Sequence, residues 1–142
     1  MFDRCLYFNL NAMTRMVNKV WEEAFQKLGL SPSHAYLLRA VLAQPGMLQK
    51  EIAQELTLSP ATVTRFIDAM VAQGLVERKV TRDGREARIY ATKRARSLHR
   101  DLEKTGQALY AKMRATLGVN KFDSLVKSLR QGRRVLSEEK GA

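Results

Sequence analysis

The chain has 142 residues, a length typical of a single domain, and its 25 Lys and Arg against 14 Asp and Glu give a net charge of +11. Hydrophobic residues make up 45% of it, enough for a packed core and too much for a disordered chain. It contains no apolar run long enough to span a membrane, and charged residues such as Asp3 and Arg4 argue against a signal peptide. A single cysteine excludes an internal disulfide and a cysteine-rich zinc site. We therefore expect a cytoplasmic protein with a polyanionic partner, most commonly nucleic acid.

The chain begins with a long amphipathic pattern. Apolar residues recur at steps of three and four from Phe2 to Leu28, which predicts a helix of about seven turns. Gly29 is placed to end it. Because so long a helix has little of its own domain to pack against, we expect it in a helical bundle or a dimer.

Three more helices follow, and a tight turn joins the last two. Ser31-Pro32 and Ser59-Pro60 each combine a capping hydroxyl with a proline at the first helical position. Residues 49–56 form a short helix before the second of these pairs, and Thr57-Leu58 forms the turn. This arrangement predicts a helix-turn-helix.

The helix that starts after Ser59 has a narrow apolar stripe at positions 63, 66, 67, 70 and 71. Its other face carries small or hydrogen-bonding side chains, which suit entry into a major groove and readout of base edges. We expect Ser59 to cap this helix first and to contact phosphate second. The candidate DNA-binding residues of the motif are Ser59, Thr62, Thr64 and Arg65, with Lys50 as a candidate phosphate contact.

A basic hairpin is predicted next. Segments 75–80 and 88–91 are rich in β-forming residues, and Asp83-Gly84 between them is a strong hairpin-turn signal. Residues 76–100 hold nine of the 25 basic residues, so the charge is concentrated here. Cations on a protruding ribbon suit a wing that enters the minor groove or straddles the phosphate backbone. The wing candidates are Arg82, Asp83, Arg85 and Arg88.

The remainder is predicted to be helical. Thr92 caps a helix that runs through Met113, with Gly106 as a weak point, Gly118 ends it, and a last helix begins at Asn120. The order is thus four helices, a hairpin and two helices. The fold class is mostly α with a small β-hairpin wing.

The quoted motifs resemble the MarR family of winged-helix transcription regulators. The resemblance is carried by residues 50–56, 59–70 and 74–78, followed by Asp83-Gly84-Arg85 and Thr92, and it extends over nearly the whole chain. Ala95 departs from the family pattern, in which a glycine often follows the second wing strand.

The resemblance implies a homodimer in which the first, fifth and sixth helices interlock. It also implies a palindromic double-stranded DNA operator and repression relieved by a small-molecule effector or by oxidation. In such a wing, Asp83 holds Arg85 in place. We expect one unit over 1–142, with a winged helix-turn-helix at 31–92 and dimerisation helices at 1–29 and 96–142.

Two sets of residues are candidates for the response to a signal. Cys5 is either a small buried hydrophobe or a redox sensor, since a position near a helix N-terminus beside Arg4 stabilises a thiolate. Trp21, His34 and Tyr36 are candidates for an effector pocket, and packing in the core is the alternative for each.

Neither catalysis nor a cofactor is expected. The two histidines, His34 and His99, are far apart, and no nucleophile–base spacing, carboxylate pair, phosphate loop or metal-ligand cluster is present in the sequence. The alternative function is a non-specific basic DNA-binding or protein-interaction module without effector response. Such a module would bind DNA without sequence preference.

Overall fold

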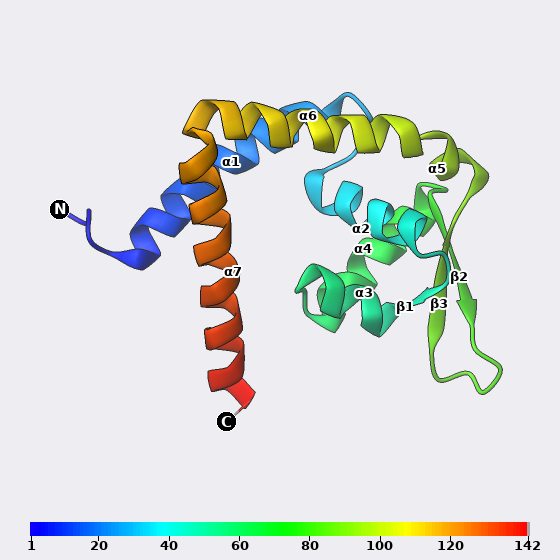
Figure 1. Ribbon diagram of the computed structural model, residues 1–142. Helices are drawn as coiled ribbons and strands as arrows, with labels where there is room; N and C mark the ends of the chain where they lie inside the picture. Colours follow the sequence, from blue (N-terminus) through cyan, green and yellow to red (C-terminus); the bar gives the residue numbers. More distant parts are fainter. Residues whose placement is uncertain (142) are drawn as a thin grey trace. The chain divides into compact units, whose positions relative to one another are not determined.

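The computed structural model describes residues 1–141 and divides into two compact units, Met1–Thr105 and a second that begins at Gly106. The described residues are mostly helical with a small antiparallel sheet, which confirms the predicted fold class (Figure 1). The elements are α1 (Leu6–Gln26), α2 (Pro32–Ala43), β1 (Met47–Leu48), α3 (Gln49–Leu56), α4 (Pro60–Ala72), β2 (Val76–Val80), β3 (Ala87–Ala91), α5 (Lys93–Ser97), α6 (His99–Leu117) and α7 (Val119–Gly141).

The predicted capping hydroxyls start their helices. Each of the three accepts a hydrogen bond from the backbone N–H three residues later, at 3.2 Å. These bonds satisfy amides that the first helical turn leaves without a partner. The capping residues are Ser31 of α2, Ser59 of α4 and Thr92 of α5.

The turn between α3 and α4 is as tight as predicted. Thr57 ends α3 in the left-handed conformation at φ 54°, the one positive φ among the described residues that are not glycine. The two helices then pack through buried side chains, with Ile52 on α3 and Val63 and Ile67 on α4. Val71, expected in the same stripe, is 40% exposed. Each step of four residues turns about 40° around the helix, which carries Val71 from the buried stripe to its flank.

The wing belongs to a three-stranded sheet with the order β1-β3-β2, and the sequence did not reveal β1. The predicted strands were nearly right, since β2 starts one residue later than expected and β3 one residue earlier. Gly46 brings β1 onto β3. Its φ is +83°, its N–H donates to the Ile89 carbonyl at 3.0 Å, and a Cβ there would lie 3.0 Å from the Tyr90 hydroxyl oxygen. Only glycine fits this approach without displacing Tyr90.

The core of the first unit draws on helices and sheet alike. Phe25 of α1, Ile89 of β3 and Leu102 of α6 are all fully buried. This shared core holds the wing strand and the helix-turn-helix in one body. The other large side chains that are fully buried are Leu37, Leu38, Val41, Ile52, Val63, Ile67, Met70 and Val76.

Two expected helix boundaries were wrong. The first helix begins at Leu6, and Phe2 lies before it, 53% exposed. The helix expected from Thr92 to Met113 is interrupted at Leu98, whose N–H bonds the Ala95 carbonyl in a tightened turn. The hydroxyl of the neighbouring Ser97 donates a hydrogen bond to the Arg94 carbonyl. Such side-chain bonds compete with the backbone hydrogen bonds of a helix. Gly106, the expected weak point, lies within α6.

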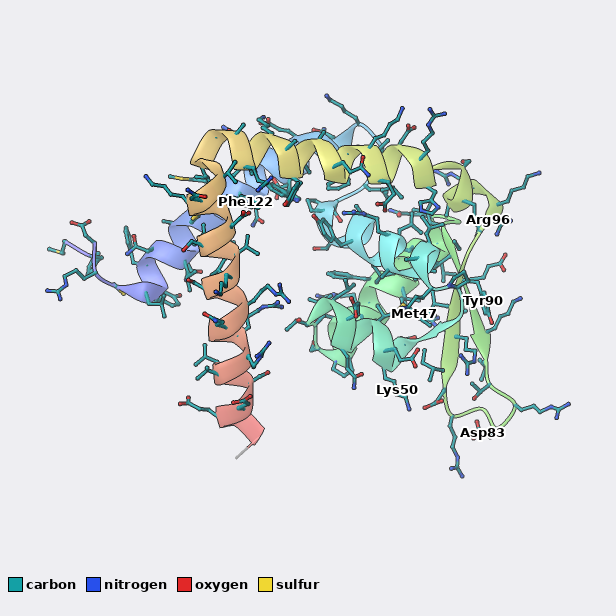
Figure 2. All side chains as sticks on the ribbon, in the orientation of Figure 1. Met47, Lys50, Asp83, Tyr90, Arg96 and Phe122 are labelled. Atoms are coloured by element: carbon teal, nitrogen blue, oxygen red, sulfur yellow. The ribbon has the colours of Figure 1, made fainter. Side chains whose placement is uncertain are left out.

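The second unit comprises the C-terminal part of α6 together with α7, which begins one residue before the expected Asn120. The rings of Tyr110 and Phe122 meet edge to face at 5.4 Å, and Phe122 is labelled in Figure 2. The Arg114 guanidinium donates to the Asp123 carboxylate at 3.1 Å. These contacts join the two helices across the turn at Gly118.

Candidate nucleic-acid interface

The polar face of α4 is open to solvent. Thr64 and Arg65 are exposed, and Thr62 is half-buried. Arg65 lies with its guanidinium carbon 5.8 Å from the centre of the Phe66 ring, a loose cation–π contact. The buried stripe on the opposite side anchors α4, so this face is available to a partner.

Ser59 and Thr62 bond to one another at the start of α4. The Ser59 oxygen accepts from the Thr62 N–H at 3.2 Å, while its hydroxyl donates to the Thr62 side-chain oxygen at 2.8 Å. Ser59 thus serves the cap, as expected, and also engages the Thr62 hydroxyl.

Thr64 has partners on both helices of the motif. Its hydroxyl donates to the Pro60 carbonyl at 3.0 Å and accepts from the Gln49 side-chain amide at 2.7 Å. Gln49, the first residue of α3, therefore contacts the exposed face of α4, although only Lys50 of that helix was a candidate from the sequence. In the sequence, only the position of Gln49 at the start of the first helix of the motif indicated that it lies near α4.

An ion pair connects α4 to the wing. The Arg78 guanidinium of β2 donates to the Asp68 carboxylate of α4 at 2.6 Å. Because α4 and β2 also pack against each other, this pair fixes the wing relative to the exposed face of α4.

The tip of the wing is organised around Asp83, which Figure 2 shows at the far end of the hairpin. Its carboxylate accepts from the Thr81 hydroxyl at 2.8 Å and from the Arg85 N–H at 3.1 Å, and the Arg85 Nε lies 3.9 Å away. The Thr81 hydrogen bond, and after it the Arg85 backbone bond, lower the pKa of Asp83. Gly84 completes the turn at φ +74°, a left-handed conformation that favours glycine.

The wing arginines differ in their surroundings. Arg82 and Arg85 are exposed beside the turn. Arg88, on the central strand, donates to the Gly46 carbonyl at 2.9 Å. Its guanidinium therefore supports the loop before β1, whereas the two arginines at the tip stand clear of the sheet.

Lys50 and Glu86 join α3 to the wing. The lysine ammonium lies 2.5 Å from a carboxylate oxygen, and this hydrogen bond raises the pKa of Lys50. A groove between the two elements is lined by both residues together with Gln49 and Arg85. Two of the candidate DNA-binding residues, Lys50 of the motif and Arg85 of the wing, thus line one groove.

The three residues expected around an effector pocket do not come together. The Trp21 Nε1 donates to the Tyr36 hydroxyl at 3.1 Å, whereas the His34 ring packs edge to face on Phe66 of α4 at 5.2 Å. Residues two apart on a helix point about 200° apart, so His34 and Tyr36 lie on opposite sides of α2. The structure thus brings Trp21 and Tyr36 together and places His34 on Phe66, and the effector pocket stays a prediction. Burial lowers the pKa of His34.

An aromatic and charged cluster surrounds Tyr36 instead. Its ring meets the Phe25 ring edge to face at 6.0 Å, and the Arg39 guanidinium carbon lies 5.1 Å from its centre. The Arg39 guanidinium in turn donates two hydrogen bonds to the Glu103 carboxylate of α6, at 3.0 and 3.3 Å. These bonds lower the pKa of Glu103 and raise the pKa of Arg39. Sequence spacing alone did not indicate Arg39 or Glu103.

Cys5 occupies the position before the first turn of α1 and is exposed. The expectation of a buried hydrophobe is wrong within this chain, because the helix starts at Leu6 and leaves residue 5 outside its packed part.

Two absences hold for the part of the chain that the structure describes. Its His, Cys, Asp and Glu side chains form no group of three suited to a metal ion. None of its helices combines the length and hydrophobicity needed to cross a membrane.

The model of the MarR family matches residues 28–86, the segment that contains the helix-turn-helix and most of the wing. The HTH-type transcriptional regulator YwoH of Bacillus subtilis (strain 168) is 30% identical over 100 residues, which cover 70% of this chain and 73% of that protein. The chain belongs to the MarR family. Because MarR-family members are transcriptional regulators, the chain is a DNA-binding regulator and not an enzyme.

Solved structures share the fold of this MarR-family chain over almost its full length. The transcriptional repressor CouR bound to a 23-mer DNA duplex superposes with a TM-score of 0.81 at 21% identity, covering 92% of this chain and 93% of that one. The S. aureus MepR–DNA complex gives 0.82 at 14% identity, with 94% and 99% covered. The regulator SlyA gives 0.80 at 21% identity, with 95% and 96% covered. At these identities the likeness shows the fold alone.

Proposed function

We propose that this MarR-family regulator is a repressor that binds a palindromic operator as a homodimer and is released by a small ligand or by oxidation. The observation that carries the proposal is that the polar face of α4 is exposed while α4 packs against the first strand of the basic wing. Thr64 and Arg65 are exposed on α4, and the Asp68–Arg78 ion pair holds that helix against the wing that bears Arg82 and Arg85. In this proposal α4 enters the major groove, while the wing contacts the minor groove or the backbone.

Each DNA-binding candidate has one role in the proposal. Thr62, Thr64 and Arg65 face base edges, and Ser59 and Lys50 lie near phosphates. Arg82, Arg85 and Arg88 bring cations to the backbone, and Asp83 orients the wing tip. CouR and MepR, proteins with the same fold, were solved bound to DNA, which supports DNA binding by this fold.

Exposed apolar surface on the outer helices supports a homodimer. In α1, Phe25 is the buried residue, whereas the side chains of Leu6 and Tyr7 are 70% and 78% exposed. In α7, Val135 and Leu136 are more than half exposed. Apolar surface of this extent on elements 1–29 and 96–142 suits burial against a second copy of the chain. A palindromic operator would follow from the two-fold symmetry of such a dimer.

The cluster around Tyr36 supports an effector site. Its members combine an indole and a phenol beside the Arg39–Glu103 ion pair, a set suited to an aromatic molecule with a polar group. Trp21 is the single tryptophan of the chain, so its fluorescence reports directly on this cluster. Oxidation at Cys5 is the second candidate route of release.

The experiment that tests the regulator function is selection of bound duplexes from random DNA, followed by titration of selected and scrambled sequences across a range of salt. A regulator should prefer its operator by about 10³-fold or more, and the selected sequences should be palindromic. Mass measurement of the complex should give two chains per duplex. Equal affinity for selected and scrambled DNA, with a steep salt dependence, would instead indicate a non-specific basic module.

A further inference from the structure

We propose that Thr64 recognises DNA through its methyl group, that the base it reads is a thymine, and that Gln49 is the positioning residue that presents this methyl. The proposal rests on the proposed function and adds to it the base chemistry at one position of the reading helix.

The starting observation is that the Thr64 hydroxyl is already occupied. A hydroxyl has one proton to donate, and Thr64 donates it to the Pro60 carbonyl at 3.0 Å. The same oxygen accepts from the Gln49 amide at 2.7 Å. Its proton and one of its two lone pairs are thus used within the protein, so a base acceptor that approached this hydroxyl would have to displace the Pro60 carbonyl.

The bond from Gln49 also selects a rotamer. Threonine in a helix divides between two side-chain rotamers, because its hydroxyl can bond a carbonyl of the preceding turn. Gln49 comes from α3 and so approaches from one fixed side. Only a rotamer that directs the hydroxyl toward both Pro60 and Gln49 satisfies the two bonds together.

What Thr64 then presents to a partner is its methyl group. The residue is exposed on the same face of α4 as Arg65. With the hydroxyl proton and one lone pair engaged by the protein, the side chain can no longer donate to a base and offers its methyl group beside a single lone pair. In the major groove thymine alone presents a matching apolar group, the C5-methyl. Arg65, one residue further along, offers hydrogen-bond donors and is suited to the acceptors of guanine.

The experiment replaces thymines of the selected operator, one symmetric pair at a time, with deoxyuridine. Uracil keeps the pairing edge of thymine and lacks only the C5-methyl. At one position per half-site we expect wild-type affinity, measured by fluorescence anisotropy, to fall about fourfold, the effect of losing one buried methyl contact. At the other thymines we expect little change.

Three variants separate methyl from hydroxyl. Thr64→Ser keeps the hydroxyl and lacks the methyl, so it should bind the thymine and uracil operators equally. Thr64→Val keeps a methyl without a hydroxyl, so it should retain a preference for thymine. Gln49→Ala should show a smaller thymine-to-uracil ratio than wild type, because Thr64 is then free to change rotamer. That ratio would not move if Gln49 merely stabilised the fold.

Thr116→Ser provides the matched control. Its hydroxyl makes the same bond to the carbonyl four residues back, Lys112, at 2.8 Å on exposed α6 surface, so it should keep the full thymine preference. If wild type binds selected and scrambled DNA alike, the regulator function fails and this proposal with it. If wild type prefers its operator but Thr64→Ser shows the same uracil sensitivity, the function stands and the thymine assignment is overturned. A Thr64→Val protein without thymine preference would also overturn it.

Discussion

The Lys50 ammonium lies 2.5 Å from the Glu86 carboxylate, so one ion pair ties the first helix of the DNA-binding motif to the tip end of the wing. Figure 2 shows Lys50 at the same edge of the first unit as Asp83 of the wing tip. Lys50 is exposed and Glu86 only half-buried, so the pair adds little to stability. Its consequence is that the lysine proposed to contact phosphate is engaged by a carboxylate when DNA is absent.

Glu86→Gln should therefore strengthen binding to DNA. The change removes a negative charge from the surface and releases Lys50 for a phosphate. We expect the slope of log affinity against log salt concentration to become steeper by about one, because one more counterion is released from the DNA on binding. Anisotropy titrations between low and physiological salt measure the slope. Glu55→Gln, which removes the same charge from an exposed position of α3, should change it less. Equal slopes for the two variants would contradict a coupling through Lys50.

Asp83→Ala should weaken DNA binding, although it removes a negative charge. The Thr81 hydroxyl and the Arg85 N–H lose their common acceptor, so the wing tip and the Arg85 side chain lose order. We expect affinity to fall about fivefold, the scale of one or two hydrogen bonds. Glu77→Ala removes a charge from β2 without touching the turn and is the control. Tighter binding by Asp83→Ala would mean that charge outweighs wing geometry.

Arg65→Ala should reduce sequence discrimination. Arg65 is exposed on the reading face of α4, and we expect its loss to cost about 1–3 kcal/mol on the operator and little on scrambled DNA. Arg82→Ala is the comparison, since a contact to the backbone should weaken both complexes alike. The measurement is the ratio of the two affinities. An Arg65→Ala protein with the wild-type ratio would remove this residue from base readout.

Cys5 provides a test of release by oxidation. The exposed thiol is accessible to an organic hydroperoxide, which would convert it to a sulfenic acid. Treated wild type should lose operator affinity and regain it with a thiol reductant, whereas Cys5→Ser should not respond. The same loss in both proteins would exclude Cys5 and direct attention to methionine oxidation.

His34 should make stability depend on pH. Burial holds its pKa below the ordinary value of 6.5, so between those two values the unfolded chain binds more protons than the folded one. Stability therefore rises with pH across this window and is lost on acidification. The melting temperature of wild type should fall more than that of His34→Gln between pH 7.5 and pH 5.5. His99→Gln, at an exposed position, should behave like wild type. An equal fall in melting temperature for wild type and both variants would mean that groups other than His34 cause the pH dependence.

Local signals in the sequence were sufficient for much of the fold. The caps at Ser31, Ser59 and Thr92 and the Asp83-Gly84 turn act within a few residues, and all start or turn the chain where expected. The break at Leu98 was missed, because a side-chain bond one residue earlier competes with the helix without a marked composition signal. The strand β1 was missed because two residues carry no periodicity and depend on β3 for their pairing.

The sequence by itself determined the class of protein, because charge, apolar periodicity and turn residues are properties of neighbouring positions. It placed the +11 charge mainly on and around a hairpin beside a nearly neutral helix-turn-helix. Only the tertiary structure decided which side chains act together. Gln49 and Thr64, 15 residues apart, share a hydrogen bond, and Arg39 and Glu103, 64 apart, share two. His34 and Tyr36, two apart, are separated by the turn of one helix. Such pairings depend on how the helices and strands pack against one another. The spacing of residues along the chain does not predict this packing.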